Sequence, residues 1–472
     1  MRSDNRLIQT CGILSVLLAV TGCVHYHPRP LAAETSLASF QSRTLDGADL
    51  AVFIRANHEV AEWPPKRWDV KTLTLASFFF NPDLDVARAD WAVARAGLVT
   101  AGERPNPDVS VVPGYNSSTP ASLMTPWILT LNLDFTIETA GKRGHRQTQA
   151  RHLSEASRLA IASAAWQVRS RVRGSLLALY SATESIAQFE KQLELQEQTV
   201  ALLRRQFDAG AISPFELTQA RIALGTMRLS LHDAIRQQGE ARAQLASALG
   251  VAVGALDGVP FDFDEFRQVP AELPAADVQR QALLNRADVL GLLAEYAASQ
   301  AALQLEVAKQ YPDIHLGPGY EMDQSDNKWT LGISAPLPLF NRNRGPIAQA
   351  EARRTQAAAR FMAGQAHALA EIERALAAYR GAVEKAATTE TMMKELERQE
   401  RAARQLFEAG EISKLELGLI QLLLAASHRA RLDALVSVHE ALGLLEDAVQ
   451  RPADIAGWVT TTPPRGEAPA KR

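Results

Sequence analysis

The feature that most constrains this chain is an eleven-residue motif that occurs twice, 200 positions apart. The copies read FDAGAISPFEL at 207–217 and FEAGEISKLEL at 407–417, and seven of their residues are identical. In each copy a glycine suited to the left-handed end of a helix precedes Ser-x-x-Glu, which can form a capping box at the start of the next helix. Each copy therefore predicts the turn of a helical hairpin, and the pair predicts a large internal duplication.

The duplication extends to segments with the pattern of strands. PDVSVVPGY at 107–115 is matched by PDIHLGPGY at 312–320. After each of them apolar and polar residues alternate, from Trp127 to Glu138 and from Lys328 to Leu339. A period of two predicts a strand with one apolar and one polar face, paired as a hairpin with the segment before it. A sheet packed on a soluble core would give the same alternation.

Three features favour a membrane sheet over a soluble one. The alternating segments exceed the usual length of about 5–6 residues, each has a tryptophan near its start that suits an aromatic girdle, and the chain begins with an export signal. Four strands are too few to close a barrel, because known ones begin at about eight. The pattern therefore predicts an oligomer.

The rest of the chain has the pattern of long helices. The predicted helical segments are 71–103, 143–208, 213–249, 276–310, 345–408 and 413–449. Residues 143–208 would form a helix about 100 Å long, at about 1.5 Å per residue, which two shorter helices placed end to end could flank. A seven-residue apolar period predicts a left-handed supercoil; its positions are Val172, Leu179, Ile186, Leu193, Val200 and Phe207.

The N-terminus has the pattern of a secretory signal. Arg2 and Arg6 precede an apolar run at 11–20, which is too short to span a bilayer and ends in Val-Thr-Gly-Cys. That ending resembles a bacterial lipobox, which predicts removal of residues 1–22 and a lipid on Cys23; the alternative is a plain signal peptide in which Cys23 is incidental. No cysteine follows Cys23, so we expect no disulfide. Beyond the signal, no apolar stretch reaches 18 residues.

These patterns predict a domain order. Residues 23–70 form an N-terminal linker and part of a side domain, and 71–249 form the first repeat with strands at about 107–139. Residues 250–275 complete the side domain. The second repeat occupies 276–449, with strands at about 312–340, and 450–472 form a tail.

Composition argues against several classes of function. The formal charge of −3 and pI near 6.4 leave no basic excess for nucleic acid. We find no zinc-type ligand set, phosphate-binding glycine loop or nucleophile–base arrangement, so we expect no enzyme, cofactor or resident metal. His25 and His27 are expected to be solvated.

The residues in this order resemble the TolC-like outer-membrane efflux channels, and specifically the lipoprotein members. The resemblance rests on Asn81-Pro82-Asp83-Leu84, both strand hairpins, PLFNRNRG at 338–345 and the paired Phe-x-Ala-Gly tips. It implies a mainly α fold with a small transmembrane β part: a homotrimer whose duplicated helical hairpins form an α-barrel tunnel, with four strands per chain in a 12-stranded β-barrel in outer-membrane lipid. It also implies a periplasmic adaptor (membrane-fusion) protein and an inner-membrane pump driven by protons or ATP.

The resemblance assigns roles to particular residues. The adaptor-docking tips would be Phe207, Gly210, Ile212, Ser213, Phe407, Gly410, Ile412 and Ser413. Glu416 matches the first acidic position that narrows the family's entrance, whereas Leu419 occupies the second; a capping box alone would also explain Glu416. The lumen-facing strand residues would be Thr130, Asn132, Asp134, Thr136 and Glu138, with simple solvation as the alternative.

The expected function is a passive efflux conduit for small toxic compounds or heavy-metal cations. ETAGKR at 138–143 resembles the branch that exports cations such as cobalt, zinc, cadmium, copper or silver. The alternatives are a channel for type I protein secretion, which shares the fold, and a structural coiled-coil lipoprotein without a pore.

Overall fold

The computed structural model describes residues 25–58, 60–118, 125–269, 284–324 and 326–450. Contacts divide the chain into two units, and the boundary in the sequence falls between Arg43 and Thr44. The first contains helix α2 (Ala33–Gln41), which buries none of its residues. Cys23, the predicted lipidation site, lies outside the described residues.

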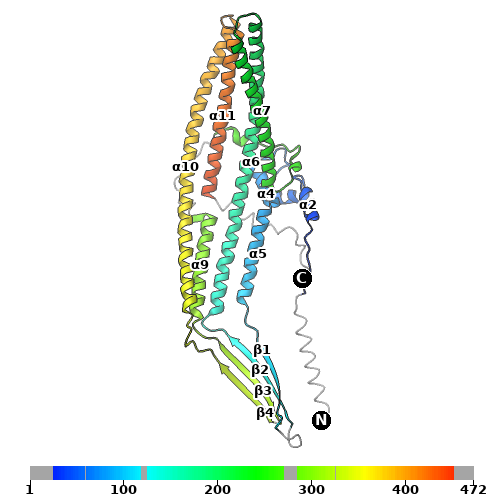
Figure 1. Cartoon of the computed structure of the whole chain (residues 1–472), viewed down its shortest axis with the longest axis vertical. Helices are drawn as coiled ribbons and strands as arrows, with labels where there is room; N and C mark the ends of the chain where they lie inside the picture. Colours follow the sequence, from blue (N-terminus) through cyan, green and yellow to red (C-terminus); the bar gives the residue numbers. More distant parts are fainter. Residues whose placement is uncertain (1–24, 59, 119–124, 270–283, 325, 451–472) are drawn as a thin grey trace. The chain divides into compact units, whose positions relative to one another are not determined.

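The second unit is built from long helices and one sheet (Figure 1). Two helices are far longer than the others: α6 (Lys142–Asp208) and α10 (Arg344–Glu408). The other helices are α3 (Ala48–Asn57), α4 (Val70–Phe80), α5 (Pro82–Gly102), α7 (Pro214–Leu249), α9 (Ala287–Ala308) and α11 (Lys414–Val449), with two 3₁₀ turns, η1 (Val253–Leu256) and η2 (Asp264–Arg267). No helix in the described ranges combines the length and apolar character needed to cross a membrane.

Each long helix is flanked by two shorter ones, as the segment lengths predicted. Helix α6 packs against α5 and α7, and α10 packs against α9 and α11. The two repeats also meet, because α6 contacts both α9 and α11.

The four strands form one antiparallel sheet in the order β1-β2-β3-β4. They are β1 (Asp108–Tyr115), β2 (Trp127–Ile137), β3 (Ile314–Asp323) and β4 (Asp326–Ser334). The predicted hairpins are confirmed as β1–β2 and β3–β4. Strands β2 and β3 pair across the repeats, with Thr136 opposite His315.

Three predicted boundaries differ in the structure. The helix predicted over 276–310 corresponds to α9, which begins at Ala287 after the extended Arg286. Strand β4 ends at Ser334 rather than near residue 340, because Pro336 and Pro338 have no N–H to donate to a ladder. The helix expected over 71–103 is broken between α4 and α5 at Asn81. Its side chain accepts a hydrogen bond from the Asp83 amide at 2.9 Å and donates to the Ala248 carbonyl at 2.8 Å.

The largest hydrophobic core lies where α3, α4, α6 and α7 meet the segment between the repeats. Its fully buried side chains include Leu50, Phe78, Leu176, Leu245 and Phe266. Gly250, just after α7, has φ +77°, and a Cβ there would lie 2.7 Å from the Phe80 carbonyl oxygen. This close approach of two backbones requires glycine.

The seven-residue apolar period of α6 is buried only in part. Val172 and Leu179 belong to the core, whereas Ile186, Leu193 and Val200 are half-buried. Over the same stretch the buried side chains are polar ones: Ser185, Gln192, Gln196 and Thr199. The part of α6 nearest the hairpin turn therefore has apolar surface that the rest of the chain does not fully cover.

Candidate functional site

The two hairpin tips have the same backbone geometry. Gly210 and Gly410 have φ of +74° and +80°, which glycine adopts without strain. In the first tip the Gly210 amide donates to the Phe207 carbonyl at 2.9 Å, and the Ala211 amide donates to the Gln206 carbonyl at 2.8 Å. This is a Schellman motif, and the second tip repeats it.

Both tips continue into a capping box, as the sequence predicted. The Ser413 amide donates to Oε2 of Glu416 at 2.7 Å, and the Glu416 amide donates to Oγ of Ser413 at 3.2 Å. The bonds from the backbone and side chain of Ser413 lower the pKa of Glu416. Ser213 and Glu216 form the equivalent box. The structure thus shows the capping contacts predicted for Glu416, and Leu419 is 54% exposed.

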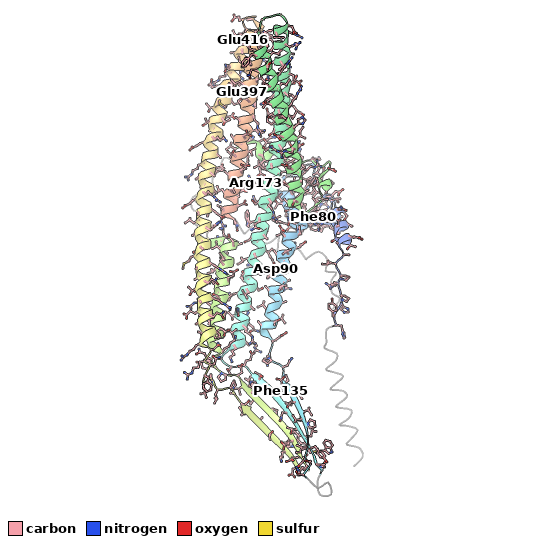
Figure 2. The ribbon with its side chains drawn as sticks, in the orientation of Figure 1. Phe80, Asp90, Phe135, Arg173, Glu397 and Glu416 are labelled. Carbon is pink, nitrogen blue, oxygen red and sulfur yellow. The ribbon has the colours of Figure 1, made fainter. Side chains whose placement is uncertain are left out.

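The predicted docking residues lie at the two turns that join α6 to α7 and α10 to α11, and both turns are at the same end of these helices (Figure 1). Phe207, Ile212 and Ile412 are half-buried, and Phe407 is 37% exposed. The two glycines and two serines of the tips are exposed. In Figure 2, Glu416 marks this end and Phe135 marks the sheet at the other.

One face of the sheet is apolar and exposed in this chain. Its exposed side chains include Val109, Val111, Leu131, Phe135, Leu331 and Ile333. Tyr115 packs on Trp127 with ring centroids 5.1 Å apart, and Tyr320 packs on Trp329 at 4.9 Å. Each hairpin therefore carries a Tyr–Trp pair at its far end, the arrangement expected of an aromatic girdle.

The opposite face carries the polar residues of β2. Asp134 lies across from Asp108, and Thr136 lies across from His315. Nδ1 of His315 lies 2.9 Å from Oδ2 of Asp134 and 3.4 Å from Oγ1 of Thr136. Glu138 differs from the other predicted lumen residues, because it follows the last residue of β2 and forms an ion pair with Arg146.

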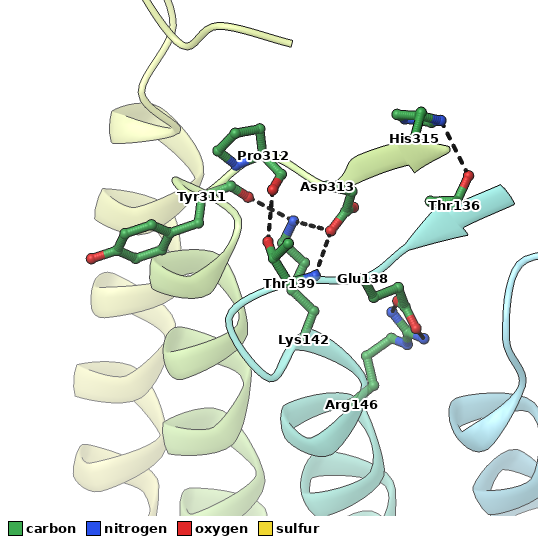
Figure 3. Close-up of polar contacts among 9 residues, drawn as sticks. All are labelled: Thr136, Glu138, Thr139, Lys142, Arg146, Tyr311, Pro312, Asp313 and His315. Atoms are coloured by element: carbon green, nitrogen blue, oxygen red, sulfur yellow. Dashed lines mark hydrogen bonds and ion pairs between the residues drawn. The ribbon is translucent and has the colours of Figure 1, made fainter. Parts of the chain in front are cut away.

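Hydrogen bonds connect the junction between β2 and α6 to the residues just before β3 (Figure 3). Nζ of Lys142 donates to Oδ1 of Asp313 and to the Tyr311 carbonyl, both at 2.7 Å. The Thr139 amide also donates to Asp313, at 2.9 Å. Burial alone would raise the pKa of Asp313, but the bonds from Lys142 and Thr139 outweigh it and lower that pKa.

A charged cluster around the buried Arg173 joins α6, α11 and η2. Arg173 is 3% exposed; its Nη1 donates to the His439 carbonyl at 2.7 Å, and its Nε lies 3.6 Å from Glu265 and 3.7 Å from Glu446. Burial raises the pKa of Glu265. Burial and the charge of Arg173 lower the pKa of His439.

Sequence reasoning missed several of these residues. His315 lies on the polar face of β3, opposite Thr136, and could have been found by extending the alternation into β3. The Lys142–Asp313 and Arg173–Glu265 contacts gave no sequence signal, because their partners are far apart in the chain. Within the described ranges, no group of three or more His, Cys, Asp or Glu side chains is placed to hold a metal ion.

Comparison with known proteins gives consistent results. The chain is 26% identical over 277 residues to the cobalt-zinc-cadmium resistance protein CzcC of Cupriavidus metallidurans, covering 57% of this chain and 62% of CzcC, which is less than two thirds of that relative. It is 26% identical over 451 residues to the cation efflux system protein CusC of Escherichia coli O6:H1, covering 89% of this chain and 93% of CusC.

The fold is also similar to solved structures. A crystal structure of CusC matches with a TM-score of 0.66 at 22% identity, covering 83% of this chain and 95% of that chain. The sequence model of the outer membrane efflux protein family matches residues 80–251 and again 278–449, one match for each repeat. Because these matches cover well over half of the sequence, the chain belongs to the outer membrane efflux protein family.

Proposed function

We propose that this chain is the outer-membrane channel of a tripartite efflux system that exports divalent metal cations. The main support for the proposal is that one chain of this family combines a two-faced sheet with long helical hairpins. A sheet with an exposed apolar face and a polar face suits a lipid boundary around a water-filled lumen, and long helical hairpins lead away from it. Such a chain is a passive conduit, and the pump supplies the energy.

The channel would be a homotrimer. Strands β1 and β4 are the two edges of the sheet, and unpaired backbone groups in lipid are costly. Joining β4 of one chain to β1 of the next would satisfy both edges, and three chains would close a 12-stranded barrel. The half-buried Ile186, Leu193 and Val200 give the helices apolar surface for the same association.

The proposed cargo follows from the relatives. CzcC is named for cobalt, zinc and cadmium resistance and CusC for cation efflux. Asp134, with Asn132, Thr130 and Thr136, would line the lumen and favour cations weakly. OpmQ of Pseudomonas aeruginosa, a pyoverdine export protein, is 24% identical over 58% of this chain, so organic cargo is the competing outcome of a substrate test.

The hairpin tips would dock the periplasmic adaptor, which couples the channel to an inner-membrane pump. The capped turns at Gly210 and Gly410 present rigid, exposed ends for that contact. Glu416 would narrow the entrance in addition to capping its helix. A lipid on Cys23 would anchor the N-terminus to the outer membrane.

The test is conductance of the purified full-length protein in planar lipid bilayers. We expect cation-selective currents from a trimer that resists dissociation in mild detergent. Stable protein that inserts into the bilayer without producing current would overturn the proposal. It would instead support the alternative of a structural lipoprotein without a pore. A matched control is protein heated above its unfolding temperature and then added at the same concentration.

A further inference from the structure

His315 stands in an arrangement typical of imidazoles that bind transition metals. Within the described part of the chain, its ring makes polar contacts with Asp134 at 2.9 Å and with Thr136 at 3.4 Å, both through Nδ1. An ionised carboxylate can only accept a hydrogen bond, so this contact with an ionised Asp134 favours the tautomer in which Nδ1 carries the proton. In the neutral ring the lone pair is then on Nε2. Histidine ligands of metals are usually oriented in this way by a carboxylate or carbonyl on the other nitrogen.

The surroundings of this pair are open. The His315 side chain is 33% exposed and that of Asp134 is 43% exposed. The next position along the polar face of β3 is Gly317, which pairs with Gly332 of β4. Neither glycine has a side chain, so the sheet surface beside His315 leaves room for a cation that keeps most of its water.

We propose that Nε2 of His315 is a transient ligand for divalent transition-metal cations such as Zn²⁺ and Co²⁺, with Asp134 as the residue that positions the ring. Imidazole suits these cations, whereas Mg²⁺ and Ca²⁺ prefer oxygen ligands. A single imidazole per chain holds a cation weakly, and weak sites suit conduction because the ion must also leave. The inference rests on the proposed function, in which this face of the sheet lines the pathway.

The test compares Zn²⁺ with Mg²⁺ as blockers of K⁺ current through the full-length protein in planar bilayers. For the wild type we expect half-block by Zn²⁺ at a clearly lower concentration than by Mg²⁺, because imidazole suits Zn²⁺ and Mg²⁺ prefers oxygen ligands. His315→Gln keeps a donor for Asp134 but removes the imidazole, so it should abolish the difference. Asp134→Asn should raise the half-blocking Zn²⁺ concentration about 10-fold, in the range seen for such orienting carboxylates.

The matched control is Asp108→Asn. Asp108 lies directly across from Asp134 and carries the same charge, but no hydrogen bond joins it to His315 within the described residues. Its loss should shift block by Zn²⁺ and by Mg²⁺ equally. Equal block of the wild type by both cations would overturn the inference, as would unchanged Zn²⁺ block in an intact His315→Gln trimer.

Equilibrium binding separates this inference from the channel proposal. The detergent-solubilised wild-type protein should bind one more Zn²⁺ per chain than His315→Gln, whether or not it conducts. An absence of current in every salt would count against the channel. Equal Zn²⁺ binding by the two proteins would count against the role of His315, even in a conducting channel.

Discussion

Gly443 of α11 lies so close to Arg173 of α6 that a Cβ at position 443 would stand 2.5 Å from Nη1 of Arg173. The absence of a side chain lets the guanidinium reach the His439 carbonyl at 2.7 Å. Arg173 also approaches Glu265 of the segment between the repeats. One buried arginine therefore ties the first repeat to the second and to the segment that joins them.

Gly443→Ala should destabilise the protein by about 1 kcal/mol, because displacing a buried guanidinium from its partners costs more than alanine gains in helix stability. The measurement is denaturant unfolding in detergent micelles. Gly174→Ala is the control: Gly174 follows Arg173 on α6 and is exposed, and a Cβ there would meet no other part of the described chain within 4 Å. This variant should be neutral or slightly stabilising. Equal losses in the two variants would contradict the account of Gly443.

Lys142→Met should destabilise the strand-to-helix junction by about 2 kcal/mol at neutral pH, because two charged hydrogen bonds are lost. Denaturant unfolding in detergent micelles measures this loss as well. Arg143→Met, which removes the same charge one residue later, should cost much less.

The loss in Lys142→Met should depend on pH in a defined direction. The pKa of Asp313 is lowered in the folded protein, so its contribution is present above the ordinary aspartate value of about 3.9. It disappears as the pH falls through the lowered value. Unfolding measured from pH 7 downwards should show the difference between the wild type and Lys142→Met narrowing below about pH 4. The part due to the bond with the Tyr311 carbonyl should remain. A constant difference at all pH values would contradict the role of Asp313.

Glu416→Gln should separate the capping and gating roles of this residue. Glutamine can still accept the bond from the Ser413 amide, so amide exchange at the start of α11 should stay slow, whereas in Glu416→Ala it should speed up. If Glu416 also narrows the entrance, Glu416→Gln should lower the cation selectivity of the reconstituted channel. Glu216→Gln provides the same change at the first tip. Unchanged selectivity in Glu416→Gln would leave capping as its only role.

Local signals in the sequence predicted the elements of the fold well. A glycine followed by Ser-x-x-Glu predicted the turns of both hairpin tips. This prediction succeeded because such turns are formed by residues that are adjacent in the sequence. Alternation gave the hairpins, although the prolines after Ser334 ended β4 earlier than the alternation did. The break at Asn81 precedes Pro82, the first residue of α5, a position that proline favours. The apolar pattern alone did not indicate this break within 71–103.

Contacts between distant parts of the chain could not be predicted in the same way. The pairing of Arg173 with α11 depends on the packing of two helices whose contacting residues are 266 positions apart. The seven-residue period identified apolar positions on α6, but Gln192 and Gln196 are the buried ones near the tip. Whether a residue near the tip of α6 is buried depends on which neighbouring helix its side of α6 faces. The apolar period alone does not specify which helix that is.

The most direct test of the central claim is metal efflux from living cells. Cells of the native strain and of a strain lacking this gene would be loaded with radioactive zinc or cobalt, and the metal retained over time would be measured. The account predicts that the deletion strain retains more of both metals and that the wild-type gene restores efflux. Equal rates of metal loss in the two strains would contradict it.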